Sequence, residues 1–125
     1  MKKIINTENA PKAIGPYSQA VEANGMLFVS GQIPLDPATG KFAEGGIKEQ
    51  TEQVFKNIEA ILTAAGYSFD DVVKSTCLLA DISDFAAMNE VYSRFYTKDF
   101  PARAAYAVKG LPMGALIEIE TIAAK

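Results

Sequence analysis

The sequence predicts an α+β fold with the element order β-β-α-β-α-β-β, in which two helices cover one face of a single β-sheet. Two long segments repeat apolar residues at spacings of three and four, the period of an amphipathic helix. Shorter segments rich in β-branched and apolar residues precede, separate and follow them, as strands do. The chain has 125 residues, the size of one ordinary domain, so we expect a single domain over residues 1–125.

The first two strands are expected to form a hairpin. Residues 17–23 and 26–30 have the composition of short strands and flank Asn24-Gly25, a strong signal for a two-residue turn. Residues 31–40 contain two prolines and a closing glycine, which predicts a loop.

Two helices follow. The first is predicted over residues 47–65, because apolar and small residues recur along one side and Gly66 is a natural C-terminal stop. The second begins after the N-cap candidates between Asp81 and Asp84 and ends before Pro101. Its apolar side consists of Phe85, Met88, Tyr92, Phe95 and Tyr96.

Three further strands are expected at residues 71–80, 103–109 and 116–124. The strand at 71–80 carries apolar residues on both of its alternating sides. We assign Arg103 to the helix-free face, where small and weakly polar residues suit contact with another subunit. A sheet that is apolar on both faces is usually covered on both, so the pattern predicts an oligomer.

Composition excludes several classes of function. The net charge is −3, the pI is about 4.9 and no run of Lys and Arg is present, which argues against a nucleic-acid-binding surface. No apolar run approaches the roughly 18 residues of a membrane span. Polar residues 6–9 interrupt the apolar start, so we expect neither a membrane segment nor a secretory signal. These features favour a cytoplasmic protein.

The chain contains no histidine, which removes His-based acid/base catalysis, the Ser-His and Cys-His nucleophile systems and most zinc sites. Its one cysteine, Cys77, excludes an internal disulfide and fits a reducing compartment. Because Cys77 lies in an apolar segment, we interpret it as a buried small hydrophobic residue.

Arg103 and two glutamates are the candidates for chemistry. The arginine begins a strand after Pro101 and presents a planar fork that matches a carboxylate, although composition alone favours a surface or structural ion pair. Strict alternation puts Glu118 and Glu120 on the face opposite the neighbouring isoleucines, which we expect to be the helix-free face assigned to Arg103. Whether Arg103 approaches Glu118 depends on a strand register that the sequence does not fix.

Four segments, in this order along the chain, resemble the Rid (YjgF) family: Ile14-Gly-Pro-Tyr-Ser-Gln19, Leu27-Phe-Val-Ser-Gly-Gln-Ile-Pro34, Pro101-Ala-Arg-Ala-Ala105 and Ile117-Glu-Ile-Glu-Thr-Ile-Ala123. The resemblance implies a chorismate-mutase-like α+β fold and a homotrimer with three clefts between subunits. It also implies hydrolysis of 2-imino acids and their enamine tautomers, such as 2-iminopropanoate and 2-iminobutanoate, to 2-oxo acids and ammonia.

The resemblance also implies roles for individual residues. Arg103 matches the carboxylate-binding arginine, and Glu118 matches the residue that binds or activates water. Ala105 stands where many relatives have cysteine, so a role for that thiol is absent here. The implied mechanism needs neither a metal nor a cofactor. The implied substrate-binding residues are Tyr17, Ser30, Gly31, Asn89, Arg103 and Ala105.

Two other functions stay open at this point. One is a non-catalytic regulatory or chaperone-like module that binds 2-oxo acids, because a carboxylate-binding arginine serves either role. The other is a translation inhibitor or ribonuclease, against which the acidic pI and the absence of histidine argue.

Overall fold

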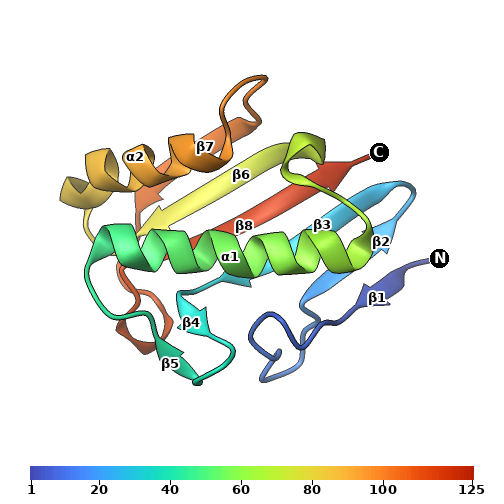
Figure 1. Cartoon of the computed structure of the whole chain (residues 1–125), viewed down its shortest axis with the longest axis horizontal. Helices are drawn as coiled ribbons and strands as arrows, with labels where there is room; N and C mark the ends of the chain where they lie inside the picture. Colours follow the sequence, from blue (N-terminus) through green and yellow to red (C-terminus); the bar gives the residue numbers. More distant parts are fainter.

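Both helices lie on one face of a six-stranded sheet, in the view of Figure 1. The computed structural model describes residues 1–125. The strand order is β1-β2-β3-β8-β6-β7, and only β6 and β7 pair in parallel. The strands of this sheet are β1 (Lys3–Ile5), β2 (Ala20–Ala23), β3 (Met26–Gln32), β6 (Val72–Leu79), β7 (Ala102–Ala107) and β8 (Ile117–Ala124).

The helices confirm the sequence prediction. The first, α1 (Ile47–Ala65), crosses the middle of the sheet and stops at Gly66, whose φ of 82° is in the left-handed region that favours glycine. The second, α2 (Phe85–Phe95), follows a short 3₁₀ turn in which Asp81 accepts a hydrogen bond from the Ser83 backbone N–H. Neither helix is both long enough and apolar enough to pass through a lipid bilayer.

The core fills the space between the helices and the sheet. Phe55 of α1 stacks on Phe95 of α2 at a centroid distance of 4.6 Å and meets Tyr92 and Tyr96 edge-on. In β8 every second residue from Ile117 onward is buried, which confirms the alternation predicted from the sequence. This packing fixes which side of each strand points away from the helices.

Several short strands were not predicted. β1 pairs with β2 at one edge of the sheet, and β4 (Leu35–Asp36) pairs with β5 (Lys41–Phe42) inside and just after the segment predicted to be a loop. Strands of two or three residues are too short to show an alternating pattern. The hairpin at Asn24 is confirmed, but its first strand begins at Ala20 and not at residue 17, because the chain makes a tight turn from Gly15 to Tyr17.

The prediction that Arg103 lies on the helix-free face was wrong. The parallel register pairs Arg103 with Ser75 and Ala105 with Cys77, and both β6 residues are fully buried beneath the helices. Arg103 therefore points toward α2. The chain passes through α2 before it reaches β7. The position of α2, and not the sequence pattern of β7, therefore sets which side of β7 faces the helices.

The opposite side of the sheet, here called the helix-free face, carries both glutamates as predicted. Leu78 pairs with Glu118 on one side and Tyr106 on the other, and Thr76 pairs with Glu120. Large apolar side chains on this face remain exposed, including Phe28 at 44% and Tyr106 at 50%. A patch of this kind is typical of a surface that contacts another protein.

Candidate active site

Arg103 is held in a cradle formed by one side of α2. One terminal N–H group, at Nη1, donates a hydrogen bond of 2.6 Å to Asn89 Oδ1. Its Cζ lies 4.7 Å from the centroid of the Tyr92 ring and 5.4 Å from that of Phe85. The aromatic faces attract the cation, and the amide satisfies one of its five donors. The remaining donors are left for a ligand.

No carboxylate neutralises Arg103, because the three ion pairs of the chain involve other residues. The guanidinium borders a cavity of about 340 Å³. Side chains of α2 and of the segment before β7 form its walls, and the residues that line it are Asn89, Tyr92, Ser93, Phe100, Pro101 and Arg103. This cavity is well suited to a small molecule that carries a carboxylate.

Glu118 lies directly over Gly31. A Cβ added at Gly31 would stand 2.8 Å from Cδ of the Glu118 carboxyl, and one carboxyl oxygen would be closer still. A β-bulge contributes to this arrangement: Val29 pairs with Thr121 and Gln32 with Ile119, so Ser30 and Gly31 together stand opposite Glu120, and Gly31 lies beside Glu118, the next residue of β8 on the same face. Only glycine leaves room for the carboxylate at this point.

The environment of Glu118 favours its protonated form. Partial burial raises the pKa of its carboxyl above the usual value, and the negative charge of Glu120 adds to the effect. A raised pKa makes the carboxylate a stronger proton acceptor than that of an ordinary glutamate.

Tyr17 and Ser30 belong to the same region as Gly31. The Ser30 hydroxyl donates a hydrogen bond of 2.6 Å to the Ser18 carbonyl oxygen, which ties the loop of Tyr17 to β3. Tyr17 and Gly31 both line a cavity of about 290 Å³, and the Tyr17 side chain is 53% exposed. These residues thus belong to a second region of the surface, which is separate from the Arg103 cradle.

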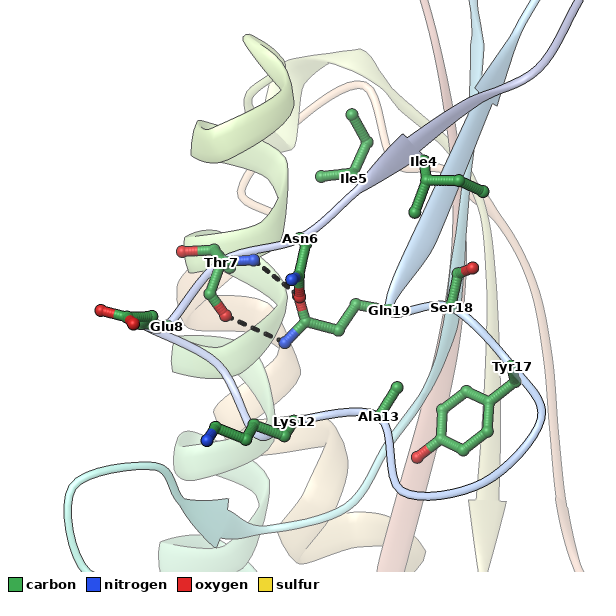
Figure 2. Close-up of a pocket in the computed structure, with 10 residues that line it drawn as sticks. All are labelled: Ile4, Ile5, Asn6, Thr7, Glu8, Lys12, Ala13, Tyr17, Ser18 and Gln19. Carbon is green, nitrogen blue, oxygen red and sulfur yellow. Dashed lines mark hydrogen bonds between the residues drawn. The ribbon is translucent and has the colours of Figure 1, made fainter.

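Gln19 fixes the loop that carries Tyr17, and we did not assign it a role from the sequence. Figure 2 shows its buried amide reaching across to Thr7, where it accepts a hydrogen bond from the backbone N–H at 2.7 Å and donates one to the carbonyl oxygen at 3.0 Å. The same amide donates to the carbonyl oxygens of Ala10 and Pro11. In the sequence, the only sign of this role is that Gln19 ends the segment Ile14-Gly-Pro-Tyr-Ser-Gln19.

The remaining candidates support the core. Ala105 is a residue of β7 that pairs with Cys77 of β6, and it packs, partly buried, against the core. Cys77 is fully buried, as the sequence interpretation held, and burial raises the pKa of its thiol. The structure therefore brings Arg103 together with Asn89, and Glu118 together with Gly31, on opposite faces of one sheet.

The fold, a sheet with two helices on one face, matches that of solved structures. A family model described as endoribonuclease L-PSP matches residues 7–125. The chain belongs to this family, which is the YjgF/RidA family that the four sequence segments resemble.

Relatives of high similarity cover the whole length. A RutC family protein of Pyrococcus horikoshii is 58% identical over 100% of this chain and 99% of its own. The human 2-iminobutanoate/2-iminopropanoate deaminase is 50% identical over 98% of this chain and 90% of its own. The crystal structure of YyfA, a Rid-family protein of Yersinia pestis, matches with a TM-score of 0.97 and 48% identity over 100% of both chains.

Proposed function

We propose that this chain hydrolyses reactive 2-imino acids and their enamine tautomers, such as 2-iminopropanoate and 2-iminobutanoate, to 2-oxo acids and ammonia. The observation that carries the proposal is the Arg103 guanidinium, which borders a cavity and has no carboxylate partner within the chain. A substrate carboxylate supplies that missing charge. The named activity of the human relative, half of whose aligned residues are identical, indicates the reaction.

In the proposed mechanism Arg103 binds the substrate carboxylate and Glu118 orients a water molecule. Glu118 removes a proton from the water as the oxygen attacks the electrophilic imine carbon, and it returns this proton to the nitrogen to give a carbinolamine. The hydroxyl proton of the carbinolamine then passes to the nitrogen as the C–N bond breaks, which releases ammonia and leaves the carbonyl of the 2-oxo acid. Positioned proton transfer of this kind accelerates a reaction roughly 10²–10⁴-fold.

We propose that the active form is a homotrimer with its clefts between subunits. The positions of Arg103 and Glu118 on opposite faces support this, because a cleft that contains both requires one of them from a neighbouring subunit. Tyr17, Ser30 and Gly31 accompany Glu118 in this scheme, and the exposed apolar residues of the helix-free face supply the contact area.

We also propose a cytoplasmic location, where the free thiol of Cys77 is stable.

An assay with freshly generated 2-iminopropanoate tests the function. The enzyme accelerates ammonia release over the uncatalysed rate, whereas a binding module binds pyruvate without any acceleration. Incubation with a labelled RNA serves as the third arm, since the family model is described as an endoribonuclease. Cleavage of RNA without acceleration of ammonia release would overturn the proposal.

A further inference from the structure

The face of the Tyr92 ring contacts the guanidinium of Arg103. The ring lies closer to the guanidinium than that of Phe85, and the side chain is 5% exposed. Its hydroxyl is buried and no hydrogen-bond partner satisfies it. Burial raises the pKa of this hydroxyl, and the nearby Ser75 side chain offsets part of the rise. The ring, and not the hydroxyl, is therefore the part of Tyr92 that meets Arg103.

Two contacts together fix the guanidinium. Attraction to the aromatic face holds the guanidinium against the Tyr92 ring, and the hydrogen bond from Nη1 to Asn89 restrains its rotation there. Both residues stand on the same side of α2, and burial against Phe55 keeps the Tyr92 ring from turning away. An arginine held this way meets a carboxylate without first losing rotational freedom.

We infer that Tyr92 is a positioning residue for the reaction, because its ring face orients Arg103 toward the carboxylate of a 2-imino acid. The inference rests on the proposed function for the identity of the substrate. The effect of Tyr92 on carboxylate binding can be measured without turnover. The ring face also excludes water from one side of the guanidinium, which strengthens the charge-assisted hydrogen bonds on the other side.

Substitutions at position 92 separate the ring from the hydroxyl. Tyr92→Phe keeps the ring and is expected to change the Kd for pyruvate and the KM for 2-iminopropanoate less than twofold. Tyr92→Leu removes the aromatic face and is expected to raise both roughly 3- to 30-fold, the range of a partly buried cation–π contact, with a smaller effect on kcat.

Tyr96 provides a matched control. It lies one helical turn beyond Tyr92, is 4% exposed, carries another unpartnered buried hydroxyl and packs on Phe55, but no cation–π contact joins it to Arg103. Tyr96→Leu is expected to lower the melting temperature about as much as Tyr92→Leu while leaving the Kd for pyruvate unchanged. An equal loss of pyruvate binding in both variants would reduce Tyr92 to a core residue and overturn the inference.

A fluorinated series keeps the test independent of folding. Phenylalanine and its 3,5-difluoro and 3,4,5-trifluoro analogues at position 92 have nearly the same shape, while the electrostatic attraction of the ring for a cation falls stepwise. The Kd for pyruvate is expected to rise along the series, and a constant Kd would overturn the inference. Wild-type protein that binds pyruvate without releasing ammonia would overturn the proposed function only, whereas wild-type protein that does not bind pyruvate would overturn both.

Discussion

Arg103 and Glu118 lie on opposite faces of the same sheet, although strands β7 and β8 that carry them both pair with β6. Arg103 pairs with Ser75 and points toward α2, and Glu118 pairs with Leu78 and points away from the helices. One chain therefore holds the two halves of the proposed site apart. In the proposed trimer, a complete cleft combines the arginine half of one subunit with the glutamate half of another.

Mixed trimers test this division directly. Arg103→Ala and Glu118→Gln subunits are each expected to be inactive alone, but unfolding and refolding them together in equal amounts is expected to restore about a quarter of the wild-type rate. That fraction follows from random mixing, because a quarter of the clefts then receive an intact arginine from one subunit and an intact glutamate from the next. Sedimentation should give the mass of three chains. A mass near the 13.4 kDa of one chain, or mixtures that stay inactive, would contradict the intersubunit cleft.

Arg103→Ala is expected to abolish pyruvate binding and imine hydrolysis while the protein stays folded. Two charge-assisted hydrogen bonds contribute roughly 1.5–3 kcal/mol each, so the Kd should rise about 100-fold or more. Arg103→Lys is expected to recover little, since lysine keeps the charge but lacks the fork. Calorimetric titration with pyruvate measures both. Arg94→Ala, which removes an exposed arginine of α2, is the control and should bind normally.

Glu118→Gln is expected to bind pyruvate normally and to lose most of its turnover, because glutamine keeps the shape but does not accept a proton. In the wild-type protein the active carboxylate disappears as the pH falls through its raised pKa, so kcat should decline at a higher pH than an ordinary glutamate would give. Glu120→Gln removes the neighbouring negative charge and should shift this decline to lower pH with a milder effect on the maximal rate. If the wild-type protein and Glu120→Gln had identical pH profiles of kcat, the charge of Glu120 would have no effect on the pKa of Glu118.

Gly31→Ala is expected to push the Glu118 carboxylate out of place and to lower kcat at least about tenfold, since well-packed interiors leave no room for an added methyl group. Gly110→Ala is the matched control: a Cβ there meets no atom within 4 Å, so activity should be unchanged. Combining Gly31→Ala with Glu118→Gln should cost no more than Glu118→Gln alone. Additive losses in kcat would show that the glycine acts independently of the glutamate.

Sequence patterns predicted both helices and the longer strands of this fold, but not its shortest strands or the contacts between distant elements. The helix over residues 47–65 and the hairpin at Asn24 depend on local periodicity and turn chemistry, and both have the predicted form. Arg103 was placed on the wrong face because its orientation depends on how α2 connects β6 to β7. The contact between Gly31 and Glu118 depends on a bulge, and one extra residue in a strand leaves no periodic signal.

Cys77, the only thiol, is completely covered by the native packing, and its raised pKa keeps it in the unreactive protonated form. Alkylating and disulfide-exchange reagents therefore reach it only when the sheet and helices separate. The rate at which such a reagent labels the protein consequently reports how often the chain opens, with no engineered probe and no competing cysteine. The same burial spares the Cys77 thiol from peroxide, so oxidation of this residue follows the rate at which the fold opens.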